Sequence, residues 1–364
     1  MNYIVAAKDG LHCFYYKDGV VWFCQHDGNV WSQAYELISK VRANFTVNLV
    51  DDKRPFLIWQ DDVGNLKKGR FGNGKVIDER TMIKSKDGLG QYRAIPADGG
   101  MNLVYSLPFA EGGIHMLMSQ FVGENGAWGA VRRVDNIIGM VGGLFRLIPV
   151  AGKHFLAVYQ NGGFESRIGY KEIFGDEIGG YNLLHSSIHS FGDCSFLATT
   201  HELHVACVVK GVFGSRLIYK KKGADGLSPG VVVAEGQGLH NIVLYVVNDK
   251  PHILFMRNDV LYNVGAEDDG YRWNFLPLDE REKSQNKQFS KAIFLTSGCN
   301  GQFLANELLV EVDKPWEIQE HSKYILAELK RSAQAQASES LENTEDDYNI
   351  FFDGMENDFG DFIG

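Results

Sequence analysis

Two arginines of this chain occupy the same place in a short motif that occurs twice. Residues 92–96 read YRAIP and residues 145–149 read FRLIP, and Arg42 precedes a further apolar segment. Guanidinium groups bind carboxylates and phosphates through paired, charge-assisted hydrogen bonds. We therefore predict that Arg42, Arg93 and Arg146 bind a small anionic ligand. The alternative is that they bond loop carbonyls or acids of neighbouring segments.

Two histidine pairs have residue types that suit zinc, because imidazole nitrogens are common zinc ligands. HSSIH contains His185 and His189, and HELH contains His201 and His204. The segment CSFLAT lies between the pairs and, as a strand, would hold them about 20 Å apart. HELH also lacks the two-residue gap of the metalloprotease helix. We predict no metal site and no cofactor.

Three tryptophans follow turns in HDGNVW, ENGAW and DDGYRW, namely Trp31, Trp128 and Trp273. The pattern resembles the Asp/Asn-Gly-x-Trp motif of some propeller lectins, in which a tryptophan stacks on a sugar. The resemblance implies glycan stacking by these three side chains. The alternative is that each ring packs between neighbouring repeats of the chain.

Motifs typical of catalysis are absent from the sequence. There is no nucleophile elbow, no phosphate-binding glycine loop and no Asp box of the form Ser-x-Asp-x-Gly-x-x-Trp. An active site that gathers single residues from several repeats would leave no such motif. We expect a protein that is not an enzyme, with an undetected hydrolase or lyase as a less favoured reading.

The elements that position these residues follow a repeat. Apolar strands begin at steps of 44, 46, 52, 50, 48 and 50 residues, at Leu11, Pro55, Met101, Lys153, Leu203, Pro251 and Gly301. Turn residues such as DG separate each from further short strands, which is a strong hairpin signal. This spacing suits one four-stranded propeller blade per repeat.

One repeat has a kernel that resembles a known kind of protein. KPHILF followed by VLYNV is similar to the Pro-His-Ile repeats of many bacterial propeller proteins. The resemblance covers about residues 1–320 and implies a fold without a function. We predict an all-β, seven-bladed β-propeller of four-stranded blades over residues 1–320.

In this propeller the first strands of the repeats line a central channel. We place them near 2–7, 44–50, 92–97, 145–150, 194–200, 242–247 and 292–297. Arg93 and Arg146 would then lie at the channel mouth. Because the first repeat begins on its inner strand and the last ends on its outer strand, we expect the ring to close by side-chain packing alone.

Histidine begins the second strand in four of the repeats. These histidines are His12, His154, His204 and His252, and the other three repeats have Phe56, Asn102 and Gln302 there. No single chemistry is shared by such a set. We predict a structural position that bonds a neighbouring turn, and not a ring of ligands.

The end of the chain differs from the repeats. Residues 321–336 lack glycine and proline and predict a short helix. Residues 337–364 contain nine acids and no base, which predicts a disordered acidic tail. Aromatic residues interrupt these acids and would anchor the tail on a protein partner, and they are Phe351, Phe352, Phe359 and Phe362.

Charge and cysteine content limit the partners. The net charge is −10, and without residues 337–364 the chain has 36 basic and 37 acidic residues, so a nucleic-acid partner is not expected. Five cysteines, no signal-like start and no apolar stretch long enough for a membrane favour the cytoplasm. We predict a protein-interaction platform acting through the tail or the propeller face. The alternative is a small-ligand or glycan-binding propeller.

Overall fold

The computed structural model describes twelve stretches of the chain, namely residues 2–7, 10–27, 30–49, 55–84, 89–110, 113–123, 126–150, 154–162, 165–267, 270–276, 288–296 and 303–317. The chain divides into Met1–His321 and Ser322–Gly364, and all described residues belong to the first unit. These residues form strands and turns and no helix, so none of them forms a helix that could cross a membrane. The predicted helix 321–336 and tail 337–364, with its four phenylalanines, lie outside the described residues.

Three antiparallel units open the chain, each with four strands in sequence order. The first unit contains β1 (Asn2–Ala7), β2 (Gly10–Lys17), β3 (Val20–His26) and β4 (Tyr35–Ile38). The second contains β5 (Val41–Leu49), β6 (Pro55–Asp61), β7 (Leu66–Gly72) and β8 (Lys75–Ile83). The third contains β9 (Tyr92–Ala97), β10 (Gly100–Ala110), β11 (Ile114–Gly123) and β12 (Trp128–Ile138).

Three more units follow the same plan. The fourth contains β13 (Phe145–Val150), β14 (His154–Asn161), β15 (Ser166–Phe174), the short β16 (Glu177–Ile178) and β17 (Asn182–Ser187). The fifth contains β18 (Phe191–Ala198), β19 (Leu203–Lys210), β20 (Ser215–Gly223), the short β21 (Gly226–Leu227) and β22 (Val231–Gly236). The sixth contains β23 (Leu239–Val247), β24 (Lys250–Arg257), β25 (Val260–Ala266) and β26 (Trp273–Leu276).

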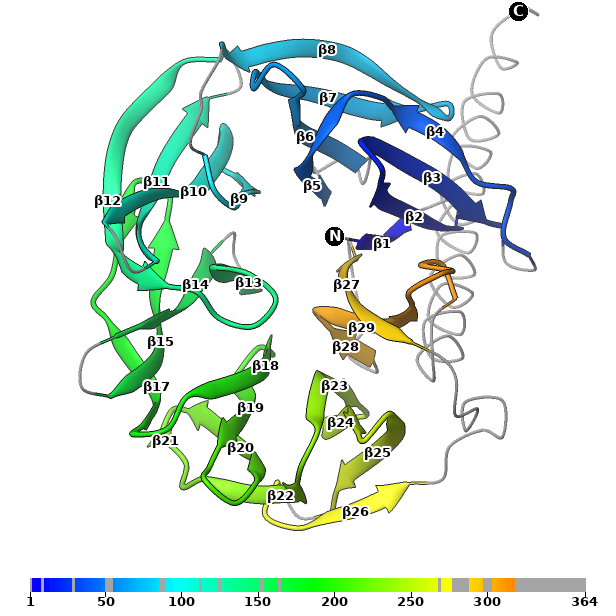
Figure 1. Cartoon of the computed structure of the whole chain (residues 1–364). Helices are drawn as coiled ribbons and strands as arrows, with labels where there is room; N and C mark the ends of the chain where they lie inside the picture. The colour runs from blue at the N-terminus through cyan, green and yellow to red at the C-terminus, as the bar shows by residue number, and fades with distance from the viewer. Residues whose placement is uncertain are drawn as a thin grey trace, which may run out of the picture. The chain divides into compact units, whose positions relative to one another are not determined.

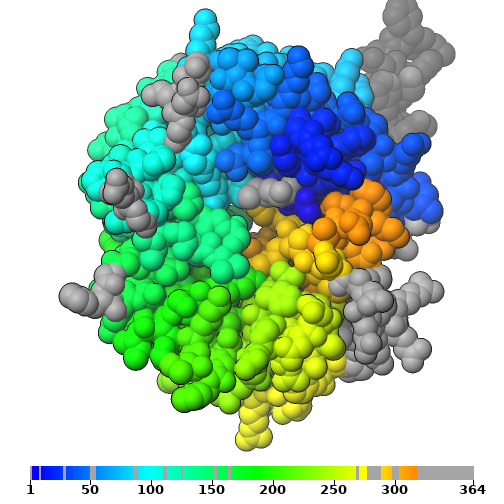
Figure 2. Space-filling model, viewed as in Figure 1, coloured from blue at the N-terminus to red at the C-terminus, as the bar shows by residue number. Residues whose placement is uncertain are grey.

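The first strands of the units converge on a common centre (Figure 1). Each of the seven segments predicted as a first strand forms a strand, the last being β27 (Phe289–Thr296). In the space-filling view neighbouring units pack against one another around this centre (Figure 2). Five apolar clusters lie between successive units, as between the second and third, where Ile58 and Leu66 meet Tyr92 and Leu103. The core is therefore divided among the interfaces between sheets.

A polar link recurs where one unit meets the next. The Asn44 amide donates to the Gly90 carbonyl, and the Asn241 amide donates to the Phe289 carbonyl, at 2.9 and 2.8 Å. The same kind of link joins Gln91 Nε2 to the Phe145 carbonyl at 2.9 Å. Each link spans about one repeat, so it holds the start of one first strand against the next.

The last segment departs from the predicted plan, and ring closure by side-chain packing alone is wrong. β1 pairs in parallel with β27, from Asn2 opposite Ala292 to Ala6 opposite Thr296. β29 (Glu307–Glu311) pairs antiparallel with the other edge of β27, and β28 (Phe303–Ala305) pairs with β23 of the sixth unit. The physical reason is that a first strand has two edges of unpaired backbone groups, and pairing across the ends of the chain satisfies them.

Candidate functional site

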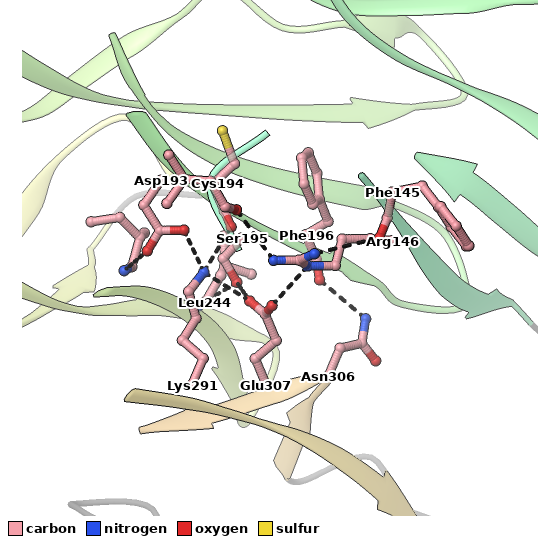
Figure 3. Close-up of polar contacts among 12 residues, drawn as sticks. Phe145, Arg146, Asp193, Cys194, Ser195, Phe196, Leu244, Lys291, Asn306 and Glu307 are labelled. Atoms are coloured by element: carbon pink, nitrogen blue, oxygen red, sulfur yellow. Dashed lines mark hydrogen bonds and ion pairs between the residues drawn. The ribbon is translucent and has the colours of Figure 1, made fainter. Parts of the chain in front are cut away.

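A buried network of charges lies where the last strands meet the fourth and fifth units (Figure 3). The Lys291 ammonium on β27 lies between the carboxylates of Asp193 and Glu307, at 2.7 and 3.3 Å. It also donates to the carbonyl of Cys194 at 2.9 Å. Burial alone would lower the pKa of Lys291, but the two carboxylates outweigh it, and the pKa lies above its ordinary value. The lysine is therefore charged and held in place.

Glu307 on β29 connects Lys291 to two further side chains, Ser195 and Arg146. Burial would raise the pKa of its carboxyl, but Lys291 and Arg146 outweigh burial and lower it. It accepts a hydrogen bond from Ser195 Oγ at 2.9 Å and forms an ion pair with Arg146 Nε at 3.3 Å. Ser195 Oγ in turn accepts from the backbone N–H of Leu244 at 3.1 Å. The network thus cross-links strands that are far apart in sequence.

Arg146 bonds an acid of a distant strand and two carbonyls, as expected if its role is structural and not anion binding. Besides Glu307, its guanidinium donates to the carbonyls of Phe145 and Val141, each at 3.4 Å. Arg42 also donates to a loop carbonyl, that of Asp62, at 3.3 Å. A guanidinium that a buried carboxylate already binds is a poor receptor for a second anion, so Arg146 is not expected to hold the ligand.

Arg93 lies close to Arg146, as the repeated motif predicts. Its side chain is buried over the ring of Tyr3, with 5.6 Å between the guanidinium carbon and the ring centroid. Burial lowers the pKa of Arg93, and the positive charge of Arg146 lowers it further. Both arginines line a central cavity of about 240 Å³, whose wall does not include Arg42.

The tryptophans have structural contacts. Trp273 on β26 packs edge-on against Tyr219 of the fifth unit at 4.9 Å, and its indole donates to the Gly270 carbonyl at 2.9 Å. Trp128 packs against the apolar cluster between the second and third units. Trp31 packs edge-on against His26 in its own unit at 5.2 Å. Sugar stacking by these rings stays a prediction. Trp273 and Trp128 pack between neighbouring units, as expected if the rings are structural.

The repeated histidines contact aromatic rings. His154 stacks on Phe174 at 4.1 Å and His252 stacks on Tyr245 at 5.0 Å. His204 Nδ1 lies 2.7 Å from the Tyr219 hydroxyl. His185 lies against Phe191, and burial with the nearby Lys220 lowers its pKa to about 4. Within the described part of the chain no three His, Cys, Asp or Glu side chains gather as metal ligands.

A second hollow lies between the second and third units. Its volume is about 530 Å³, and it opens between β6–β8 on one side and β9–β11 on the other. Its wall includes the cations Lys68, Arg70 and Arg80, the polar Asn48 and Asp78, and apolar side chains, among them Phe56, Ile95 and Met101. We call it the cationic cleft.

The three cations share one face of the second unit. Lys68 and Arg70 are two residues apart on β7 and so point to the same side of the sheet, and Arg80 on β8 lies directly opposite Lys68. Burial lowers the pKa of Lys68, and Arg80 and Arg70 lower it further. Within the described residues none of the three forms an ion pair, although Asp78 also lines the cleft. The cleft therefore has three cations to one carboxylate, and none of the three cations is neutralised by an ion pair among the described residues.

Sequence reasoning missed this group. By itself NLKKGRF indicates only a charged outer strand. The spacing of Lys68 and Arg70 does predict a shared face. The arrival of Arg80 beside them depends on the pairing of β8 with β7, which contains two register shifts that sequence spacing does not reveal.

Comparisons with known proteins identify a fold and no family. No family model and no curated sequence matches the chain. Similar solved structures include the polysaccharide lyase Uly1, at 10% identity and a TM-score of 0.54 over 86% of this chain and 88% of the lyase. A prolyl endopeptidase follows at 11% and 0.50, over 86% of this chain and 47% of that one. The SapL1 lectin, solved with alpha methyl fucoside, is similar at 10% and 0.45, over 75% and 94%. At these identities the likeness shows an all-β, β-propeller-like fold.

Proposed function

We propose that this chain is a non-enzymatic binding protein whose cationic cleft holds a small anionic ligand. The observation that carries the proposal is the convergence of Lys68, Arg70 and Arg80 on an open cleft without an ion pair among the described residues. Like charges repel one another at this range, and an anion relieves the repulsion of all three. The planar arginine groups suit carboxylate or phosphate, which present two oxygens side by side.

We also propose the finer architecture that the sequence predicts. Six complete four-stranded units and the strands β27 to β29 would make a seven-bladed ring, with the first and last units joined by the β1–β27 pair. Support comes from the even repeat and from the seven first strands at the expected places. A protein partner for the tail and a cytoplasmic location stay predictions.

The test is a titration of the full chain with citrate, a trianion, in low-salt buffer by isothermal titration calorimetry. We expect binding that weakens as salt rises, because part of the attraction is screened. Arg70→Gln with Arg80→Gln should weaken binding about 100-fold, at roughly 1.5 kcal/mol for each charge-assisted contact. Both side chains are exposed, so the fold should tolerate the change.

Arg132→Gln is the matched control, since Arg132 is exposed on β12 and does not line the cleft. It should bind citrate as the unmodified chain does. Equal affinity in the double variant and the unmodified chain would remove the cationic cleft from consideration. Equal losses of citrate affinity in Arg132→Gln and in the double variant would show that net charge alone accounts for the binding.

A further inference from the structure

The cationic cleft and the central cavity share one wall. Asn48 on β5 and the β9 residues Ala94, Ile95 and Pro96 line both spaces. A molecule held by the cations therefore lies next to the ends of two first strands. The cleft, at about 530 Å³, is also larger than one oxyanion requires, since pockets of roughly 300–1,000 Å³ hold whole drug-sized molecules.

Asn48 has an unused hydrogen-bond donor at this shared wall. Its side chain is only 8% exposed, and its Nδ2 has no acceptor within the described residues. Leaving such a donor unpaired costs about 1–3 kcal/mol, and native proteins pair nearly all of them. A half-turn about χ2 exchanges the two amide atoms, so a ligand acceptor at this wall would favour the orientation that presents the nitrogen to it. An uncharged acceptor on a ligand would satisfy it.

Apolar side chains form another part of the wall. Phe56, Ile95 and Met101 line the same cleft as the cations and Asp78. Apolar side chains of this kind suit the C–H faces of a ring. The cleft thus offers three cations, an amide and apolar contact within one space.

We infer that the ligand is an acidic sugar, with its phosphate or carboxylate between Lys68, Arg70 and Arg80 and its hydroxylated ring against Asn48. The inference rests on the proposed function and names its ligand class. The charge would supply attraction, and the ring would supply the selectivity of a matched hydrogen bond. An acidic sugar combines both chemistries in a molecule that fits the volume of the cleft.

The experiment compares inorganic phosphate, glucose 6-phosphate, glucuronate and glucose on the full chain by calorimetry. We expect glucose 6-phosphate or glucuronate to bind at least 10-fold more tightly than phosphate. Glucose should bind more weakly than both acidic sugars. The two acidic sugars distinguish phosphate from carboxylate as the anionic group. Asn48→Leu should lower the affinity for the preferred acidic sugar 5- to 10-fold and leave phosphate affinity unchanged.

The other outcomes distinguish failure of the acidic-sugar inference from failure of the proposed function. Equal affinity for phosphate and both acidic sugars would overturn the acidic-sugar inference and leave the anion site in place. Equal weakening of phosphate and sugar by Asn48→Leu would also overturn it, because Asn48 would then act on the anion or on the fold. Failure of every anion, citrate included, to bind the unmodified chain would end the proposed function itself.

Asn48→Leu is expected to fold, since it removes a donor that has no partner. A thermal midpoint equal to that of the unmodified chain checks this. If the variant is less stable, Asn48→Asp provides the second measurement. An introduced carboxylate at the wall should repel every anion, whereas an Asn48 distant from the ligand would leave all affinities unchanged and overturn the inference.

Discussion

Single buried charges hold the centre of this molecule together. Lys291 and Glu307 sit in a region where either would be costly alone, and each is tolerated because the other is present. The lowered pKa of Glu307 sets the sign of its pH dependence. A carboxyl with a lowered folded pKa stabilises the fold above its unfolded pKa, near 4.5, and that stability is lost as pH falls through the folded value.

Replacing Lys291 with Met should therefore be strongly destabilising. The change leaves the carboxylates of Asp193 and Glu307 buried without their shared cation, and breaking a buried pair costs about 3–5 kcal/mol. Urea denaturation at neutral pH measures the loss. Adding Asp193→Asn to Lys291→Met should recover part of it, because Asp193 has no other ion pair among the described residues, whereas Glu307 keeps its pair with Arg146.

Lys314→Met is the control for Lys291, because Lys314 forms an exposed ion pair with Glu317. Its unfolding midpoint should match that of the unmodified chain. A Lys291→Met variant as stable as this control would show that the network contributes nothing to stability.

Several hairpins of the first, second and sixth units have two-residue turns with positive φ. Asp18 and Gly19 join β2 to β3 with φ of 52° and 81°, and Asn258 and Asp259 join β24 to β25 with φ of 50° and 60°. Turns of this hand match the twist of the flanking strands and favour Asn, Asp and Gly. This is why short polar pairs in the sequence predicted these hairpins correctly.

Asp259 offers a test of this backbone requirement. Asp259→Gly should keep or slightly raise stability, because glycine adopts positive φ without steric cost. Asp259→Val should lower the free energy of unfolding by about 1–2 kcal/mol, because the left-handed region is costly for a β-branched residue. Denaturant titrations of the two variants give the comparison. Equal stability of the Gly and Val variants would contradict the turn geometry.

Among the described residues, backbone pairing joins the first strand, β1, to β27 near the other end of the chain. β1 has β2 on one edge and β27 on the other, so neither edge is open. The charge network adds side-chain links from β29 to the fourth and fifth units, through Arg146 and Ser195. Closure therefore combines hydrogen-bonded strands with buried ion pairs.

Native-state hydrogen exchange should show this closure. In sub-denaturing urea the amides of β1 and β27 should open together and slowly, because they share one parallel pairing. The outer strand β22 (Val231–Gly236) is the internal reference, since it pairs on one edge with β20. If the amides of β27 exchanged as fast as those of β22, the parallel pairing would not be part of the cooperative core.

Sequence alone determined the features that depend on local pattern. Alternating apolar residues, polar turns and even spacing placed all seven first strands. The YRAIP and FRLIP motifs likewise placed Arg93 and Arg146 at one cavity, because equivalent positions in a repeat meet at the centre.

Tertiary structure decided the rest, because it depends on contacts between distant segments. The ion pair of Arg146 with Glu307 joins residues 161 apart, and no local pattern distinguishes it from an open anion site. The pairing of β1 with β27 likewise joins strands about 290 residues apart, as in Asn2 opposite Ala292. In the cationic cleft, irregular register brings Arg80 opposite Lys68, and the packing of the third unit encloses the space. The sequence shows which charged side chains are present, and only packing decides which of them have no ion pair among the described residues.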